Sequence, residues 1–301
     1  MNPESIAHLP EEELMTPGHL GCQGCAAALG MRHVLKALGE KTIIVLPACC
    51  WSIIAGPFPF SAVKVPVLHT AFETAASTAC GVRAALDVKG DEETTVLAWA
   101  GDGGTFDIGL QALSGAAERN ENILYICYDN EAYMNTGVQR SSATPSGAWT
   151  TTTPGRKEHP KKDIMQIMAA HRVPYAATAS VAYPEDLFRK AEKARSIRGT
   201  RFIQLLTPCP PGWKIPAELS IRLARLAVLS RVFPLYEIEE GSRFTLSTVE
   251  EPVPVSDYLK AQGRFHNLTP SDFTAYQDEI DRNWARLRSR AADWEAQRAG
   301  V

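Results

Sequence analysis

Two short polar motifs carry the clearest chemical signal in this chain. Gly101-Asp102-Gly103 follows an apolar run at 95–100, and Asn130 follows the next apolar run at 123–128. An aspartate carboxylate and an asparagine amide supply oxygen ligands of the kind that Mg²⁺ takes in proteins. Glycines allow an anion such as a diphosphate to approach the backbone closely. The spacing therefore predicts a site at which Mg²⁺ holds a diphosphate.

The segments around these motifs predict one βαβ unit. Residues 95–100 and 123–128 have the apolar character of buried strands, and 108–118 has that of the helix joining them. Asp102 and Asn130 then lie at the carboxyl ends of two parallel strands, the edge at which open α/β sheets bind ligands. An ordinary glycine-rich turn would explain the glycines alone, but it would not explain the asparagine.

Strands and helices alternate along most of the chain. This alternation favours an α/β fold, a mostly parallel, doubly wound sheet with helices on both faces. Residues 131–160 are rich in Ser, Thr, Gly and Pro, and so long an irregular segment is usually functional. Further strands are expected at 41–48, 176–181 and 201–207, with helices at 26–38, 70–86, 163–170 and 184–198.

We predict three parts in the chain. Residues 1–20 form an acidic, proline-punctuated N-terminal arm, and residues 21–215 form the α/β domain. Residues 216–301 form a C-terminal extension, which mixes a helix with short extended pieces. The extension ends in a charged amphipathic helix at 271–298, and we expect it to make subunit contacts.

The composition indicates a globular protein without a nucleic-acid or membrane partner. A chain of 301 residues is long enough to bury a full core. Its composition, 45% hydrophobic and 22% charged, is that of a globular protein. A net charge of −3 gives no electrostatic attraction to nucleic acid or to an anionic membrane. We find no apolar run long enough to span a bilayer, and residues 1–5 lack the features of a signal peptide. We therefore expect a cytoplasmic protein.

Four of the seven cysteines stand in a context that suggests a redox or metal site. Cys22 and Cys25 form a C-x-x-C pair before a predicted helix, whereas Cys50 and Cys209 each follow a predicted strand. A redox dithiol would explain only the first pair. A structural zinc and a [4Fe–4S] cluster would each explain all four, and the spacing does not decide between them.

These motifs resemble those of a known family, the β subunits of 2-oxoacid:ferredoxin oxidoreductases, of which pyruvate:ferredoxin oxidoreductase is the best known. The resemblance covers residues 19–215 and is most specific at 128–137, which read YDNEAYMNTG. The other matching segments are Cys22–Cys25, the Cys50 turn, 57–66, 69–73, 101–105, 139–145 and 209–213.

The resemblance implies bound thiamine diphosphate, Mg²⁺ and one [4Fe–4S] cluster. The Mg²⁺ ligands would be Asp102, the Asn130 side chain and the backbone carbonyl of Ala132, and Asn135 would reach the reacting carbon. The implied cluster ligands are Cys22, Cys25, Cys50 and Cys209. The residues implied to line the thiamine diphosphate are Gly101, Asp102, Gly103, Gly104, Asn130, Ala132, Tyr133, Asn135 and Cys50.

The implied activity is the oxidative decarboxylation of a small 2-oxoacid, by default pyruvate to acetyl-CoA and CO₂. Electrons would leave singly through the cluster to ferredoxin. The chain would act only with an α subunit that supplies the pyrimidine-binding domain and with a ferredoxin-like γ or δ subunit or domain.

Other interpretations of the chemistry remain open at this point. Departures from the family pattern, among them Val63 and Thr74, make another small 2-oxoacid or oxalate, which would be oxidised to CO₂ without coenzyme A, the main alternative substrate. A non-oxidative thiamine enzyme would leave the cysteines unused. A zinc-stabilised partner subunit without chemistry would leave the Gly-Asp-Gly edge unexplained.

Overall fold

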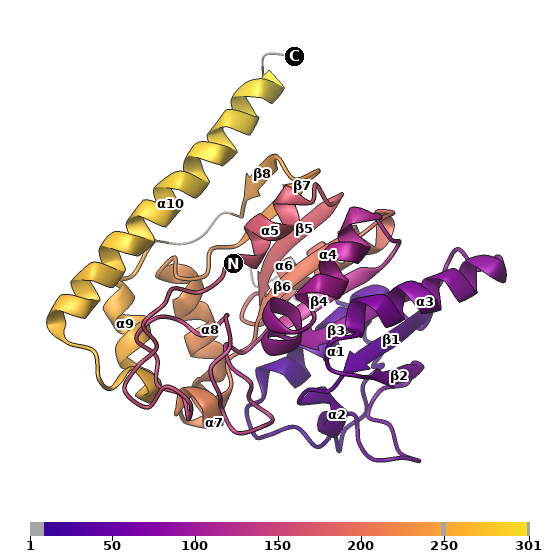
Figure 1. Cartoon of the computed structure of the whole chain (residues 1–301), viewed down its shortest axis with the longest axis horizontal. Helices are drawn as coiled ribbons and strands as arrows, with labels where there is room; N and C mark the ends of the chain where they lie inside the picture. Colours follow the sequence, from indigo (N-terminus) through magenta and orange to yellow (C-terminus); the bar gives the residue numbers. More distant parts are fainter. Residues whose placement is uncertain (1–8, 248–250, 300–301) are drawn as a thin grey trace.

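An eight-stranded sheet forms the centre of the protein (Figure 1). The structure is a computed structural model and describes residues 9–247 and 251–299. The strands are β1 (Thr42–Pro47), β2 (Val67–Thr70), β3 (Thr95–Gly101), β4 (Leu124–Asp129), β5 (Tyr175–Ser180), β6 (Arg201–Leu206), β7 (Tyr236–Glu239) and β8 (Arg243–Leu246). Their order is β2-β1-β3-β4-β6-β5-β7-β8. The first six run parallel and the last two antiparallel, which confirms the predicted, mostly parallel α/β fold.

Helices cover both faces of this sheet (Figure 1). On one face α1 (Ala26–Leu38) packs beside α6 (Pro184–Ser196). On the other lie α3 (Ala75–Val88), α4 (Leu110–Glu118) and α5 (Ile164–Ala170). Parallel strands covered on both faces need nearly continuous apolar residues, and β3 and β4 supply them.

The C-terminal helices enclose a further apolar cluster beside the sheet. Trp213, Leu223 and Tyr258 belong to this cluster. The elements outside the two main layers are α2 (Trp51–Ile54), η2 (Gly103–Asp107), α7 (Pro210–Trp213), η3 (Ala217–Leu219), α8 (Ser220–Leu229), α9 (Val255–Lys260), η4 (Gly263–Phe265) and α10 (Pro270–Ala299). The long helix α10 runs past β8, as Figure 1 shows. None of the helices in the described parts of the chain has the length and apolar character that a membrane crossing needs.

The described part of the N-terminal segment packs on the α/β domain, and residues 1–8 of the predicted arm lie outside the described residues. The Glu13 carboxylate contacts Arg32 at 2.6 Å and Lys36 at 2.9 Å, both on α1. The Thr16 amide donates to the Ala62 carbonyl at 2.8 Å. These contacts attach residues 13–16 to the domain.

The helix predicted from residue 70 begins later than expected. Val67–Thr70 instead forms β2, which pairs in parallel with β1, and α3 begins at Ala75. The Thr70 hydroxyl contacts those of Thr74 at 2.6 Å and Thr78 at 2.8 Å. The prediction was wrong here because strand pairing and this hydroxyl chain, which joins β2 to α3, both depend on the tertiary fold.

Glu237 joins the antiparallel hairpin β7–β8 to the parallel part of the sheet. Its carboxylate accepts hydrogen bonds from Arg189 and Lys193 of α6, both at 2.7 Å, and from the Tyr175 hydroxyl at 2.9 Å. Burial opposes the charge, but the hydrogen bonds from Lys193 and Arg189 prevail and lower the pKa of Glu237 to about 2. The hairpin is therefore held by an ionised, buried carboxylate.

We expect Glu237→Gln to lower the free energy of unfolding by about 2 kcal/mol near neutral pH. Because the folded pKa is depressed, this stabilisation is present above about 4.5 and disappears as the pH falls towards about 2. Urea unfolding across this range should show the curves of wild type and variant converging in acid. Glu239→Gln removes a more exposed partner of Lys193 and should change stability by less than about 0.5 kcal/mol. Equal effects of the two substitutions would contradict this account.

Candidate functional site

The predicted motifs lie together at the carboxyl ends of the strands. Asp102 directly follows β3, Asn130 directly follows β4, and α2 and α7, which follow β1 and β6, lie along the lower side of Figure 1. Immediately after Asp102 the chain forms η2, a π-helical turn, in which the Thr105 hydroxyl donates to the Gly101 carbonyl at 2.8 Å. Such turns are frequent at functional sites. Nothing in the sequence indicated this one.

Three oxygen-bearing groups, one of them the Asp102 carboxylate, converge at one point. The tip of the Asn130 amide lies 3.0 Å from Asp102 Oδ1 and 3.0 Å from the Ala132 carbonyl oxygen. If the amide nitrogen occupies this tip, it donates to both oxygens. If the amide oxygen occupies it, the oxygens of Asn130, Asp102 and Ala132 face one another. Neighbouring ligands of an octahedral Mg²⁺ at about 2.1 Å are about 3.0 Å apart. The spacing of these three groups therefore fits this ion.

The electrostatics of Asp102 also fit a cation. The side chain is fully buried, and its Oδ2 accepts a hydrogen bond from the Ser141 hydroxyl at 2.5 Å. Burial, together with the neighbouring Asp129, raises the pKa of Asp102 well above its usual range. A buried carboxylate is costly to ionise unless a positive charge compensates it. A divalent cation between Asp102 and Asn130 would provide that charge.

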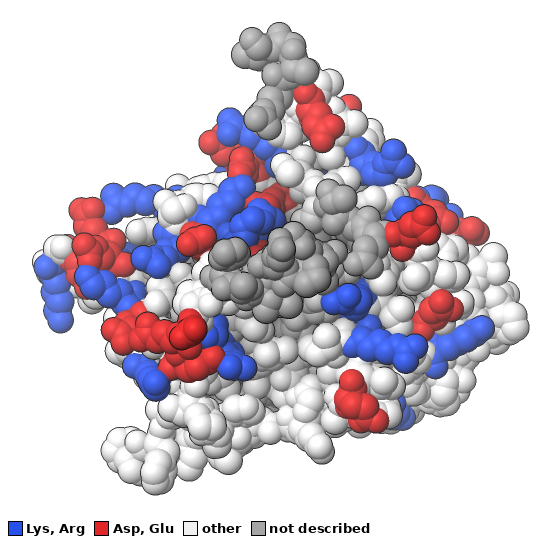
Figure 2. All heavy atoms as spheres, turned by 180° about the vertical axis from the view of Figure 1, so that it is seen from behind, with Lys and Arg blue, Asp and Glu red and all other residues white. Residues whose placement is uncertain are grey.

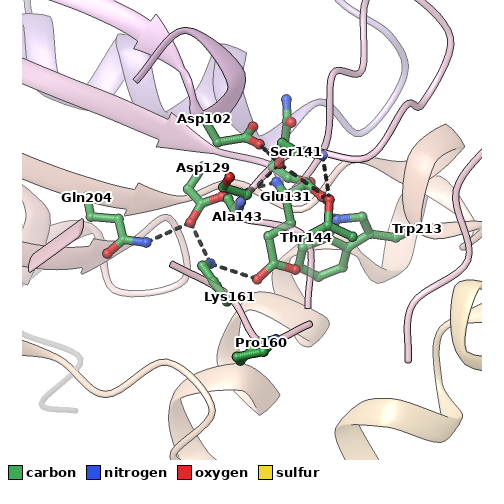
Figure 3. A network of polar contacts seen from close by, with 12 residues as sticks. Asp102, Asp129, Glu131, Ser141, Ala143, Thr144, Pro160, Lys161, Gln204 and Trp213 are labelled. Atoms are coloured by element: carbon green, nitrogen blue, oxygen red, sulfur yellow. Dashed lines mark hydrogen bonds and ion pairs between the residues drawn. The ribbon is translucent and has the colours of Figure 1, made fainter. Parts of the chain in front are cut away.

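A buried network of charges lies next to these oxygen ligands (Figure 3). The Lys161 ammonium contacts Asp129 at 2.7 Å and Glu131 at 3.0 Å. The Gln204 amide donates to Asp129 at 2.7 Å, and Arg264 contacts Glu131 at 2.6 Å. Burial opposes the charge on Glu131, yet Lys161 and Arg264 hold its pKa below the usual range. The segment that carries Asn130 is thus fixed on both sides by ion pairs.

The sequence contained no local signal for this network. Lys161 and Arg264 lie 30 and 133 residues from Glu131 along the chain, so no spacing rule connects them. Arg264 also comes from the segment interpreted as a C-terminal extension. That segment therefore contributes a side chain beside the candidate site.

Lys161 neutralises two buried acids, so its removal should be costly. In Lys161→Met, Asp129 and Glu131 lose their shared partner, and breaking a buried ion pair costs about 3–5 kcal/mol. We expect the free energy of unfolding, measured in urea, to fall by about 3 kcal/mol. Adding Asp129→Asn to this variant should recover part of the loss, because it removes one uncompensated charge. Unchanged stability in the single variant would contradict the assigned role.

All four predicted cysteines line one cavity of about 230 Å³ beside Asn130. Cys25 directly precedes α1, Cys50 precedes α2 and Cys209 precedes α7, while Cys22 lies in the turn before Cys25. The structure therefore brings the cysteines together with Asn130, one of the three predicted oxygen ligands. It also places Asn135 on the wall of this cavity, with an exposed side chain.

The chemistry of these thiols fits a cluster. Burial raises the pKa of Cys50 and raises that of Cys209 to about 12, and the neighbouring thiols add to both shifts. Thiolates at these positions therefore require a positively charged partner. Backbone N–H groups bond to the sulfurs of Cys25 and Cys209, an arrangement that tunes cluster potentials. Within the described residues, no three His, Cys, Asp or Glu side chains are close enough to hold a single metal ion. Four cysteines on one cavity supply the number of thiolates that a [4Fe–4S] cluster takes.

The C-x-x-C turn requires a glycine. Gly24 has φ +73°, and a Cβ there would lie 2.5 Å from the Ala217 carbonyl oxygen. The Ser220 hydroxyl donates to the Gly24 carbonyl at 2.8 Å. The turn that carries Cys22 and Cys25 is thus held against the start of α8.

The predicted cofactor-lining residues Gly103 and Tyr133 contact each other. A Cβ on Gly103 would lie 2.0 Å from a ring carbon of Tyr133, so a glycine is required at this close approach. The Tyr133 hydroxyl donates to Asp107 at 2.8 Å, which keeps the ring in place. This contact joins the glycine turn to the loop that follows Asn130.

Comparisons with known proteins identify the family of the chain. Residues 52–205 match the family described as "Thiamine pyrophosphate enzyme, C-terminal TPP binding domain". The chain is 54% identical to ketoisovalerate oxidoreductase subunit VorB of Pyrococcus abyssi, over 94% of this chain and 95% of the relative. It is 51% identical to pyruvate synthase subunit PorB of Methanothermobacter marburgensis, over 93% of this chain and 99% of the relative.

A solved structure shares the fold. It is a 2-oxoglutarate:ferredoxin oxidoreductase from Magnetococcus marinus, with a TM-score of 0.57 and 21% identity over 73% of this chain and 80% of that one. The curated relatives, which are nearly the same length as this chain, show the family. The chain belongs to the β subunits of the 2-oxoacid:ferredoxin oxidoreductases and carries their thiamine diphosphate-binding domain.

Proposed function

We propose that this chain holds Mg²⁺ and thiamine diphosphate at one side of the sheet edge and a [4Fe–4S] cluster at the other. Asp102, the Asn130 amide and the Ala132 carbonyl would bind the ion, and the four cysteines would bind the cluster. The observation that carries this proposal is the shared position of Asn130. It lies within 3.0 Å of the other two oxygen ligands, and it also lines the cavity of the cysteines.

The residues of the chain would orient both groups. Thiamine diphosphate supplies the electron sink for decarboxylating a 2-oxoacid, and a cluster accepts the released electrons one at a time. Asp102 and Asn130 would hold the diphosphate through Mg²⁺, next to the backbone of Gly101–Gly104. Asn135, exposed on the cavity wall, would donate a hydrogen bond to the reacting part of the substrate.

An α subunit with the pyrimidine-binding domain would complete the site. Apolar side chains are exposed near this edge: Leu20 and Ile53 line the cavity, while Phe58 and Phe60 are 97% and 77% exposed. The segment from α2 to β2 that carries the two phenylalanines lies at the lower edge of Figure 1, and Figure 2 shows few charged side chains along the lower part of the opposite face. A ferredoxin-like γ or δ subunit, and then ferredoxin, would take the electrons in the cytoplasm.

The substrate would be a 2-oxo monocarboxylic acid, either pyruvate or a branched-chain 2-oxoacid. Relatives named for ketoisovalerate and for pyruvate are almost equally similar to this chain, at 54% and 51% identity. Oxalate is the alternative that would need no coenzyme A.

Dye reduction by the anaerobically assembled complex tests this assignment. Pyruvate, 3-methyl-2-oxobutanoate and oxalate should be compared, each with and without coenzyme A. We expect reduction that is lost when bound thiamine diphosphate and Mg²⁺ are stripped and returns when both are added back, and that requires coenzyme A with the first two substrates. Reduction by oxalate alone would shift the assignment to that substrate. Inactivity with all three would contradict the proposed activity.

A further inference from the structure

Trp213 connects the Cys209 turn to the loop that carries Asn130. It is the last residue of α7, the short helix that directly follows Cys209, and it is fully buried. Its indole Nε1–H donates to the Asn130 carbonyl oxygen at 2.9 Å. Figure 3 shows the indole beside the charge network described above. One side chain therefore spans the two proposed sites.

Arg264 holds the indole from its other side. The guanidinium carbon lies 3.9 Å from the ring centroid of Trp213, and the same guanidinium contacts Glu131 at 2.6 Å. Gln262 accepts a hydrogen bond from Arg264 Nε at 2.9 Å, and the Tyr258 ring packs edge-on against the indole. The indole cannot tilt without disturbing the ion pair of Glu131.

In the turn between Asn130 and Ala132, the backbone N–H and carbonyl of Glu131 are also held by hydrogen bonds. Glu131 has φ +68°, in the left-handed region that a side chain rarely adopts. Its N–H donates to Asp129 Oδ1 at 3.1 Å, and its carbonyl accepts from the Thr144 hydroxyl at 2.7 Å. The Trp213 bond fixes the preceding carbonyl, so the directions of the Asn130 amide and the Ala132 carbonyl depend on it.

This hydrogen bond distinguishes Trp213 from other buried tryptophans. Trp51 and Trp99 are also fully buried, but their indole N–H groups have no hydrogen-bond partner within the described part of the chain. Replacing Trp99 with phenylalanine removes a similar buried volume and no such bond. Trp99→Phe is therefore a matched control for Trp213→Phe.

We infer that Trp213 is a positioning residue that couples the two proposed sites, an inference that rests on the proposed function. A cluster on the four cysteines fixes the Cys209 turn and with it the indole. The indole in turn holds the Asn130 carbonyl in the orientation that points the oxygen ligands at Mg²⁺. Because coupling between two sites is reciprocal, Mg²⁺ and thiamine diphosphate stabilise the cluster site by the same factor.

The test is the affinity of the assembled complex for thiamine diphosphate at saturating Mg²⁺, measured by calorimetry. Wild type, Trp213→Phe and Trp99→Phe are each first stripped of bound thiamine diphosphate, and each is measured with the cluster present and after its removal by oxidation and chelation. In wild type and in Trp99→Phe, cluster removal should weaken binding about 10-fold. The loaded Trp213→Phe complex should already bind about 10-fold more weakly, and cluster removal should change its affinity by less than about twofold.

The outcomes separate this inference from the proposed function. A Trp213→Phe complex that binds as tightly as wild type, or that keeps the full response to cluster removal, overturns the coupling alone. A wild type without iron or without Mg²⁺-dependent binding overturns the proposed function as well. Should Trp213→Phe fail to assemble, Arg264→Lys keeps the pair with Glu131 but loses the planar stacking, and it should show a smaller effect of the same sign.

Discussion

Asp102→Asn is expected to leave the protein folded while abolishing Mg²⁺-dependent binding of thiamine diphosphate. The amide has nearly the shape of the carboxylate and can still accept the hydrogen bond from Ser141. It lacks the negative charge of the carboxylate, and the other two proposed protein ligands of Mg²⁺ are neutral. Even outer-shell partners of a metal typically contribute about 10- to 100-fold in affinity. We therefore expect the loss of a direct ligand to exceed about 100-fold.

Thermal unfolding separates this effect from simple damage to the fold. Removing a buried carboxylate with a raised pKa should preserve or raise the Tm of the cofactor-free variant. Adding Mg²⁺ and thiamine diphosphate should raise the Tm of the wild-type complex but not that of the variant. Asp87→Asn, at the exposed end of α3 remote from the carboxyl edge of the sheet, is the control and should respond like wild type. A variant that gains as much Tm as wild type would exclude Asp102 as a ligand.

Cys50→Ser is expected to remove the proposed cluster from this chain. Serine keeps the size of the side chain but replaces the soft thiolate that iron–sulfur clusters require. The variant complex should contain about four irons fewer per copy of this chain than wild type and absorb less visible light, while the iron of the ferredoxin-like subunit remains. Iron analysis and the visible absorption spectrum of anaerobically purified protein measure this loss.

The neighbouring Cys49 provides a stringent control. It is adjacent to Cys50 and, like Cys50, packs against the core, but it does not line the cavity of the other cysteines. Its thiol is hydrogen-bonded to the Tyr128 hydroxyl. Cys49→Ser should therefore keep the iron content of wild type. Loss of iron in Cys49→Ser with retention in Cys50→Ser would reverse the assignment.

Much of the candidate site could be predicted because it depends on local pattern and on one topological rule. Apolar runs identified β3 and β4, and parallel strands joined by a helix place their carboxyl ends at one edge. The rule brought Asp102 and Asn130 together, and it brought Cys50 and Cys209 to the same edge. These placements require only strand positions, which the periodicity supplies.

The remaining features depend on contacts between distant segments. Strand β2 forms because β1 offers it an edge, and Arg264 reaches Glu131 only after the C-terminal helices have packed around Trp213. The π-helical turn after Asp102 has no periodic signature. Features of this kind result from tertiary packing, which local propensity does not determine.

The cofactor content of the complex purified without oxygen tests most directly whether this chain binds both thiamine diphosphate and a [4Fe–4S] cluster. We expect brown protein in which this chain accounts for about four irons per copy, in addition to the iron of the ferredoxin-like subunit, and release of about one thiamine diphosphate on denaturation. The iron content should fall by about four per copy of this chain in Cys209→Ser, and the thiamine diphosphate should disappear in Asp102→Asn. Colourless protein that contains zinc and releases no thiamine diphosphate would contradict the account.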